Sequence, residues 1–211
     1  MPAQAGVDTH ARPQRFREAR TARPGAVMFA HRLAVLADRP ALEELAGAAI
    51  DQLQRDYLQP DQIAASRAIM GVDTQLIQDG TYFVVHHEGR LAGCGGWSRR
   101  ATLYGGDEIA GRNDSMLDPA VDAARIRAMY THPRFARRGV GRVVLSLCEA
   151  AAAAAGFQRL ELMATMAGQP LYTSYGFAPV ERVDHASGGA IVPLVRMVKP
   201  VTRRGASSDG P

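Results

Sequence analysis

Lysine is almost absent from this chain: Lys199 is the single lysine among 211 residues, beside 24 arginines. No apolar run approaches the ~20 residues that a membrane-spanning helix needs, so we expect no membrane protein. The two cysteines, Cys94 and Cys148, lie in apolar segments and have no metal-ligand spacing with the histidines. This excludes a zinc site and predicts buried free thiols in a reducing compartment, the cytoplasm.

The two ends of the chain differ from its middle in composition. Residues 1–27 are rich in Pro, Gly, Ala and Arg and show no apolar stripe, which predicts a disordered basic tail, and residues 201–211 predict a second tail. The basic tail lacks the groove-reading pattern of a nucleic-acid arm, the serines of a transit peptide and the apolar core of a secretory signal. A start at Met28 is another alternative, because ordered patterning begins there. We favour a dispensable tail and expect no nucleic-acid partner.

The residues between these tails, 28–200, predict a single domain. With 46% hydrophobic residues over 211 positions, the chain can bury one sizeable core. No internal repeat is visible.

Hydrophobic periodicity predicts alternating strands and helices within this domain. The predicted order is a strand at 30–35, helices at 38–57 and 60–70, a hairpin at 81–87 and 90–98, a strand at 125–130, a helix from about 139 to 154, a strand at 159–164, and a strand pair at 177–182 and 191–198. Asp38 is the predicted cap of the first helix. The long helix joins its two strands as a crossover, so these strands should be parallel. The expected class is α/β (mixed α+β), a mixed sheet with helices on both faces.

A basic, glycine-containing loop precedes the long helix. Its sequence is Arg137-Arg138-Gly139-Val140-Gly141-Arg142. Glycines let a ligand approach the backbone, and the start of the helix presents unpaired N–H groups and the positive end of the helix dipole. Arginines add charge-assisted contacts, so the loop predicts a site for a pyrophosphate. The alternative is a tight structural turn with solvated arginines.

Two familiar nucleotide-binding loops do not fit this segment. A P-loop needs Lys and then Ser or Thr after its last glycine, whereas Arg142 and Val143 follow Gly141. A dinucleotide-binding fingerprint needs a third glycine, and position 144 is Val.

The order of these elements is specific. Strand, basic glycine loop, helix and strand, followed by the motif from Tyr172 through Gly176 to Phe177, resemble the cofactor-binding core of the GNAT superfamily of N-acetyltransferases. The resemblance covers roughly residues 30 to 199 and is strongest over 125–182. It implies a central, mostly antiparallel twisted sheet with one splayed parallel strand pair. It also implies acetyl-coenzyme A as co-substrate, with no metal.

The resemblance assigns roles to residues of this chain. It implies that the strand end at Met129, Tyr130 and Thr131 binds the pantetheine arm, and that Arg137 through Arg142 bind the pyrophosphate. Tyr172 corresponds to the tyrosine that in many relatives protonates the departing thiolate. Thr165 stands where relatives often carry an Asn that touches the cofactor. One alternative is that Tyr172 has only a structural role. Another is that Tyr175 is the proton donor.

The sequence gives fewer indications of the residues that bind and deprotonate the acceptor amine. The connection from Arg99 to Arg125 is rich in acidic residues, and Glu108 is the candidate general base, the alternative being a polar surface loop. Trp97 and Tyr104 are candidate walls of the acceptor pocket, and core packing is the alternative for Trp97. His132 is expected near the cofactor rather than in proton transfer.

Three functions from different classes remain. The first, which we favour, is an acyltransferase that moves acetyl from acetyl-coenzyme A to a primary amine of a small molecule or a protein, by direct attack in a ternary complex. The second is a non-catalytic acyl-coenzyme A sensor of the same fold. The third is a nucleic-acid or membrane-surface binder that uses the basic tail, and it predicts that deletion of residues 1–27 abolishes function. A homodimer through a sheet edge near the last strands is a further expectation.

Overall fold

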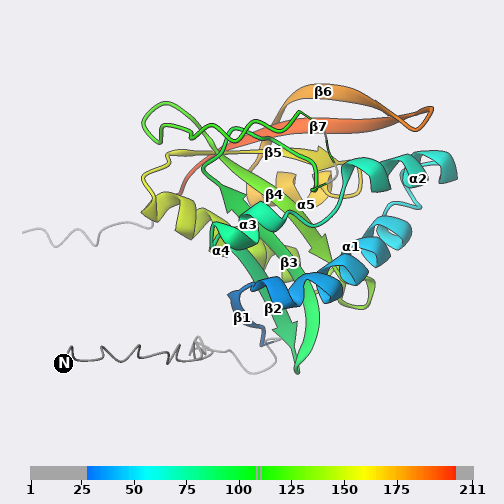
Figure 1. Ribbon diagram of the computed structural model, residues 1–211, viewed down its shortest axis with the longest axis horizontal. Coiled ribbons are helices and arrows are strands. Elements are labelled where there is room, and N and C mark those ends of the chain that lie inside the picture. The colour runs from blue at the N-terminus through cyan, green and yellow to red at the C-terminus, as the bar shows by residue number, and fades with distance from the viewer. Residues whose placement is uncertain (1–27, 108, 110, 203–211) are drawn as a thin grey trace, which may run out of the picture.

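Seven strands form one sheet in the computed structural model, which describes residues 28–107, 109 and 111–202 (Figure 1). The strands are β1 (Ala30–Leu33), β2 (Tyr82–His87), β3 (Arg90–Ser98), β4 (Ala124–Thr131), β5 (Arg159–Thr165), β6 (Ala178–Ser187) and β7 (Ala190–Pro200). Their order is β1-β2-β3-β4-β5-β7-β6, and the one parallel pair is β4 with β5. The predicted mixed, mostly antiparallel sheet is therefore confirmed.

Of the two predicted tails, the structure describes only residues 201 and 202 of the C-terminal one. Residues 1–27 and 203–211 lie outside the described residues, as does Glu108. The first two residues of the predicted C-terminal tail are held in place: the Val201 N–H donates to the Gln158 carbonyl oxygen and the Thr202 N–H to a Glu149 carboxylate oxygen.

Helices cover both faces of the sheet. The helices α1 (Arg39–Leu53), α2 (Pro60–Ile69) and α3 (Thr74–Gln78) lie on one face, and α4 (Val140–Ala154) and α5 (Gln169–Tyr175) lie on the other. Two short 3-10 turns, η1 (Leu36–Asp38) and η2 (Pro133–Phe135), complete the set. The sequence did not predict α3, because five residues are too short for a helical stripe.

The first helix begins at the predicted N-cap residue, Asp38, but without a side-chain cap. The Asp38 side chain accepts no hydrogen bond from α1. It accepts one from the Val35 N–H and pairs with Arg32, so it stabilises the turn η1 in front of the helix instead. Asp38 therefore stands at the N-cap position of α1, as predicted, but its carboxylate bonds to the residues in front of the helix and not to the helix itself.

The long helix α4 packs along the sheet through its small and branched side chains. Val140, Val144, Leu145 and Cys148 are fully buried against the strands. Cys94 is buried on the opposite face of the sheet, and burial raises the pKa of its thiol to about 12. Both cysteines are free, as predicted.

The parallel strand pair opens after two residues. β4 and β5 pair only at Ala124 with Leu160 and at Arg125 with Glu161. Beyond that point β4 stays with β3, where the register shifts at a bulge, and β5 stays with β7 over its whole length. In the bulge Ala128 has φ of +48°, a conformation that side chains rarely adopt outside turns and functional sites. The gap between the diverging strands leads to the start of α4.

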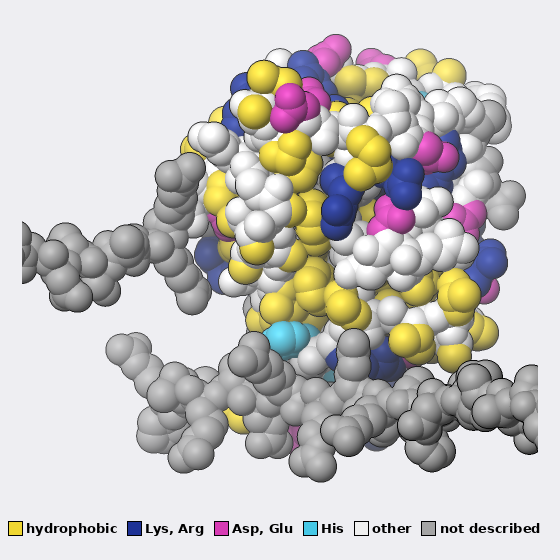
Figure 2. All heavy atoms as spheres, turned by 60° about the vertical axis from the view of Figure 1, so that its left-hand side comes forward, with side chains coloured by type: hydrophobic (Ala, Val, Ile, Leu, Met, Phe, Trp, Pro, Cys, Tyr) yellow, Lys and Arg dark blue, Asp and Glu magenta, His cyan; other side chains and the backbone are white. Residues whose placement is uncertain are grey.

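The surface mixes charges of both signs. On the face in Figure 2, arginine or lysine side chains lie close to aspartate or glutamate side chains, with hydrophobic side chains between them. Among the described residues, no helix combines the length and apolar character needed to cross a bilayer.

Candidate active site

A groove of about 720 Å³ runs past the open ends of β4 and β5. The groove is lined by the end of α1 (Ala49, Ile50, Leu53, Gln54, Tyr57), the end of β4 (Met129, Tyr130, Thr131), the loop and start of α4 (Arg137, Gly139, Val140, Gly141, Arg142), and α5 with the turn before it (Thr165, Gly168, Leu171, Tyr172, Ser174). All predicted cofactor residues except Arg138 therefore border one groove. Its volume is in the range of pockets that hold drug-sized ligands.

The glycine loop has the geometry of an anion site at a helix start. Gly139 stands immediately before α4 with φ of +91°, and a Cβ at this position would meet no atom within 4 Å. The first N–H groups of a helix have no partner within it, so those of Val140, Gly141 and Arg142 are available to an anion. Gly141 serves packing, because a Cβ there would lie 2.5 Å from Cδ2 of Leu171 on α5.

The arginines of the loop are placed differently from one another. The Arg142 guanidinium lies over the Tyr175 ring, 5.5 Å from its centroid, and donates a 3.0 Å hydrogen bond to the Ser174 carbonyl oxygen. Arg138 lies over the Phe135 ring and does not line the groove. Arg137 borders the groove with a positive φ of +62°.

The end of β4 is anchored from the face that carries α1 and α3. The Tyr130 hydroxyl donates to the Gly71 carbonyl oxygen at 3.0 Å and accepts from the Gly71 N–H at 2.8 Å. Burial raises the pKa of this phenol. The Tyr82 hydroxyl reaches the bulge itself and donates to the Ala128 carbonyl oxygen at 2.7 Å. These bonds hold the backbone of the open strand in one conformation.

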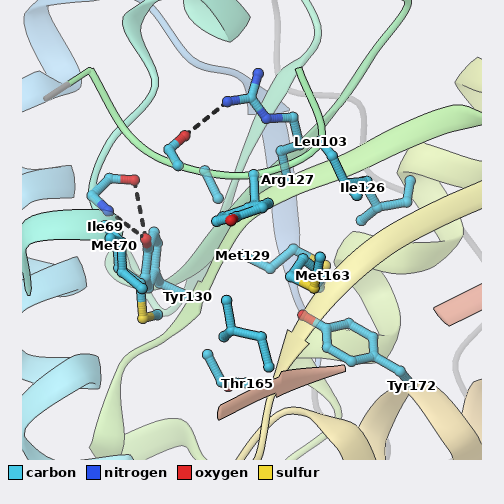
Figure 3. A pocket seen from close by; sticks show the side chains of 15 residues that line it. Ile69, Met70, Leu103, Ile126, Arg127, Met129, Tyr130, Met163, Thr165 and Tyr172 are labelled. Carbon is cyan, nitrogen blue, oxygen red and sulfur yellow. Dashed lines mark hydrogen bonds between the residues drawn. The ribbon is translucent and has the colours of Figure 1, made fainter. Parts of the chain in front are cut away.

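A second, smaller cavity of about 80 Å³ lies next to the groove. It is bordered by α2, by the connection between β3 and β4 (residues 99–123, the β3–β4 loop), and by strands β4, β5 and β7. The groove and the cavity share Met70, Met129, Tyr130, Thr165 and Tyr172. Tyr172 points its hydroxyl into this junction beside Met163, with Leu103 and Arg127 also on the cavity wall (Figure 3).

Tyr172 is supported by α5 and by the turn before it. Its ring lies edge-on to Phe177, with centroids 6.0 Å apart, and a Cβ on Gly168 would come within 2.9 Å of the ring. Thr165 borders the same junction and accepts a 3.2 Å hydrogen bond from the Gly168 N–H. Burial raises the pKa of the Tyr172 phenol, so it remains a neutral proton donor at neutral pH.

Three other candidates lie away from this junction. Trp97 is 4% exposed and packs edge-on to Phe157 in the core, and it borders neither the groove nor the cavity. Tyr175 donates its hydroxyl to Glu149 at 2.8 Å. His132 accepts a hydrogen bond from the Arg134 N–H within η2. The structure therefore gives these three side chains packing or turn-forming contacts, whereas Tyr104 does border the cavity.

A buried ion cluster beside the cavity was missed at the level of sequence. The Asp73 carboxylate lies 2.8 Å from Arg127 and 2.9 Å from Arg112, and it accepts the Gln75 N–H at the start of α3. Burial lowers the pKa of Arg127, and the Asp73 charge opposes that shift. The sequence did contain one sign of this cluster: Arg127 lies within a strand whose side chains alternate between apolar and polar, where a buried arginine needs an acidic partner. Within the described ranges, no cluster of His, Cys, Asp or Glu is placed to bind a metal ion.

The sequence of the region that builds this site matches a known family model. Residues 47–177, well over half of the chain, match the model of the Acetyltransferase (GNAT) family. The chain belongs to this family. The matched range contains the end of α1, the open strands, the glycine loop and the Tyr172 motif. The residues that line the groove therefore all lie within the part of the chain that matches the family model. Comparison with curated proteins gave no match.

Solved GNAT structures have the same fold at low sequence identity. A GCN5-related N-acetyltransferase from Rhodopseudomonas palustris is 19% identical, with a TM-score of 0.59 over 81% of this chain and 94% of its own. The acetyltransferase yncA from Salmonella typhimurium, solved with acetyl-CoA, is 17% identical, with a TM-score of 0.55 over 86% and 99%. A ribosomal-protein-alanine N-acetyltransferase from Brucella melitensis is 18% identical, with a TM-score of 0.54 over 81% and 98%.

Proposed function

We propose that this GNAT protein transfers the acetyl group of acetyl-coenzyme A to a primary amine. The observation that carries the proposal is the junction of the groove with the cavity at Tyr172 and the open end of β4. A long cofactor in the groove would place its reacting end at this junction, and an acceptor in the cavity would meet it there. A sensor that only binds an acyl-coenzyme A needs no second cavity, so this arrangement favours the transferase.

The pyrophosphate is assigned to the start of α4. The free N–H groups of the first helical turn and the positive end of the helix dipole favour an anion at this place. Arg137 and Arg142 border the groove beside it and add charge-assisted hydrogen bonds. The pantetheine arm would run along Met129, Tyr130 and Thr131, where β4 has left β5 and its backbone groups face the gap.

The chemical step needs three contributions at the junction. The neutral amine attacks the thioester carbonyl carbon, backbone N–H groups at Met129–Tyr130 stabilise the oxyanion, and the C–S bond breaks. The Tyr172 hydroxyl then gives its proton to the departing sulfur. Because the pKa of this phenol is raised, the hydroxyl still carries its proton at neutral pH when the thiolate forms.

Calorimetry with acetyl-coenzyme A, followed by an amine panel with detection of the free thiol, tests this function. We expect micromolar binding of the cofactor and amine-dependent release of coenzyme A. Binding without turnover on any amine would favour the sensor function. Absence of binding would mean that the glycine loop is only a structural turn.

A further inference from the structure

The cavity at the junction is small for an acceptor site. Its volume is about 80 Å³. Because an apolar cavity of about 150 Å³ holds benzene, a volume near half of that admits only a short chain. Its apolar walls are Ile69, Met70, Leu103, Ile126, Met163 and Leu194.

The wall formed by α2 is tied to the hairpin of β6 and β7. The Gln62 side-chain amide donates to the Ile191 carbonyl oxygen at 2.6 Å, and the Ser187 hydroxyl donates to the Ala65 carbonyl oxygen at 3.2 Å. Apolar side chains of α2, β6 and β7 fill the space between these bonds in a separate core cluster. A peptide therefore finds no open channel between α2 and the hairpin.

The wall formed by the β3–β4 loop is tied to the sheet from inside. Arg127 donates to the Gly105 carbonyl oxygen at 2.7 Å, and Arg112 donates to that of Gly106 at 3.1 Å. Gly106 also lies against the backbone of Gly71, where a Cβ would come within 3.0 Å. The loop therefore sits directly on the segment that follows α2, and both walls of the cavity are fixed.

The described lining of the cavity offers no carboxylate to an ammonium group. Among the described residues that line it, none carries a carboxylate, and Arg127 is the charged one. The Arg127 guanidinium pairs with Asp73, and Arg112 pairs with both Asp73 and Asp107, so the charges of this cluster are balanced. A second ammonium group on the acceptor would be buried without a counter-charge, at a large cost in free energy. The same environment favours the neutral, nucleophilic form of the reacting amine.

From this geometry we propose that the acceptor is a small monoamine with a short apolar chain, and that peptides, protein amines and polyamines are excluded. This inference rests on the proposed function. It narrows the acceptor from any primary amine to an amine with a short chain that enters the cavity beside the thioester.

Three acceptors of chosen shape test the inference on the full chain with acetyl-coenzyme A. Isopentylamine and putrescine have equal numbers of non-hydrogen atoms and differ by the second ammonium group, and trialanine supplies a peptide amine. We expect kcat/KM for isopentylamine to exceed that for the other two by at least about 100-fold. Equal or better use of putrescine or trialanine would overturn the inference while leaving the acetyltransferase function standing. Cofactor binding without acetylation of any amine would remove both.

A variant with an enlarged cavity tests the same inference without relying on the three acceptors above. Leu103→Ala enlarges the wall on the β3–β4 loop, and we expect the kcat/KM ratio of octylamine to isopentylamine to rise by at least about 10-fold. Leu36→Ala is the matched control, because Leu36 is 56% exposed and does not line the cavity. An unchanged ratio in Leu103→Ala, with cofactor affinity retained, would count against the cavity as the acceptor site.

An independent observation concerns the proton of the attacking amine. The Tyr104 side chain lines the cavity, and its hydroxyl lies 3.0 Å from Nδ1 of His185 on β6, with the two rings edge-on. His185 itself does not line the cavity. Imidazole is the commonest proton acceptor in enzyme catalysis, and Tyr104 connects it to the reaction space.

Other groups at the cavity do not offer this route. The Tyr130 hydroxyl is engaged with both the N–H and the carbonyl of Gly71, and Tyr172 is assigned to the thiolate. The other charged side chains that the structure describes on the elements around the pair are Arg125 and Arg127 on β4, Arg99, Arg100, Asp107, Arg112, Asp114, Asp118 and Asp122 in the loop, Glu181, Arg182 and Asp184 on β6, Asp61 and Arg67 on α2, and Arg196 and Lys199 on β7.

We infer that Tyr104 and His185 carry the amine proton away. As the C–N bond forms, the ammonium proton passes to the Tyr104 oxygen while the Tyr104 hydroxyl proton passes to Nδ1 of His185. The C–S bond breaks and Tyr172 protonates the sulfur. His185 then releases its proton to water and Tyr172 regains one from water, so the sum is amine plus thioester giving amide plus thiol.

The pH profile of kcat separates this role from simple packing. Tyr104→Phe keeps the ring and His185→Gln keeps a polar side chain, and we expect each to lower kcat on the order of 100-fold. If the relay operates, the acid limb of the wild-type kcat profile should vanish in both variants. His31→Gln on β1 is the matched control. An acid limb that persists in both variants would refute the relay, even if kcat were lower.

Discussion

The Tyr82 hydroxyl donates a 2.7 Å hydrogen bond to the carbonyl oxygen of Ala128, the one residue of β4 with a positive φ. Tyr82 is fully buried on β2, two strands away from the gap that β4 opens toward β5. A residue in a sparsely populated backbone conformation persists only where its surroundings hold it. The shape of the groove therefore depends on a side chain that does not line it.

Removal of this hydroxyl should weaken both the fold and the cofactor site. Tyr82→Phe leaves the Ala128 carbonyl without this buried donor, and we expect the free energy of unfolding to fall by about 1–3 kcal/mol. The Kd for acetyl-coenzyme A should rise as the bulge relaxes. Urea unfolding and calorimetry measure the two effects, with Val180→Ala as the control, because Val180 is exposed and does not line the groove. Wild-type values of both would contradict the role given to Tyr82.

A negative charge at the start of α4 should abolish cofactor binding. Gly139→Glu places a carboxylate beside the free N–H groups and costs strain at φ of +91°, so we expect acetyl-coenzyme A to bind at least about 100-fold more weakly. Gly139→Asn is the control, because asparagine tolerates a positive φ and carries no charge. Calorimetry compares the two variants. Equal, unimpaired affinities would place the pyrophosphate elsewhere.

Loss of the Tyr172 hydroxyl should slow the chemistry without weakening cofactor binding. We expect Tyr172→Phe to lower kcat by about 10- to 1000-fold. Because burial raises the pKa of this phenol above its usual value near 10, Tyr172 should stay protonated and the wild type should show no alkaline loss from this group below about pH 10. Steady-state rates across the pH range test both statements. An unchanged rate would mean that water or another group protonates the thiolate.

The single lysine should matter for stability. Lys199 forms a buried ion pair with Glu149, which also accepts hydrogen bonds from Tyr175 and the Thr202 N–H. Lys199→Met leaves that carboxylate unpaired, and we expect the free energy of unfolding to fall by about 3–5 kcal/mol. The double variant with Glu149→Gln should recover part of this loss. Full stability of Lys199→Met alone at neutral pH would show that the pair contributes nothing.

The same pair predicts a dependence on pH. Burial acts to raise the pKa of Glu149, but the hydrogen bonds from Lys199, Thr202 and Tyr175 outweigh it and lower the pKa. A lowered pKa means that the stabilisation is complete above the usual glutamate pKa near 4.3 and is lost as the pH falls through the lowered value. In Lys199→Met the loss should begin at a higher pH, which thermal unfolding between about pH 3 and 7 would reveal.

Long periodic segments were predictable, and short or irregular ones were not. The helix of α4 follows from an apolar face that repeats over four turns, and the hairpin of β2 and β3 from alternation around Gly89. By contrast α3 depends on Asp73, whose carboxylate is fixed by Arg112 and Arg127 from distant parts of the chain. Local pattern carries no information about such partners.

The residues of the candidate site also fall into those that the sequence predicted and those that it did not. The glycine loop and Tyr172 are recognisable because residue type and spacing within a short window determine how a helix start binds an anion. Trp97 and Tyr104 looked alike as candidate pocket walls, yet packing buries Trp97 against Phe157 and brings Tyr104 to the cavity. The partner of Tyr104, His185, lies 81 positions away and meets it only because β6 folds back beside the β3–β4 loop.

The sequence by itself determined the family, the order of elements and the residues of the glycine loop, because those depend on residues that are neighbours along the chain or along one helix. Only the tertiary structure decided the size and the lining of the cavity next to Tyr172. Its walls come from α2, the β3–β4 loop, β5 and β7, and its volume is what their side chains leave unfilled. A volume of that kind is a difference between packed surfaces, and no single segment encodes it.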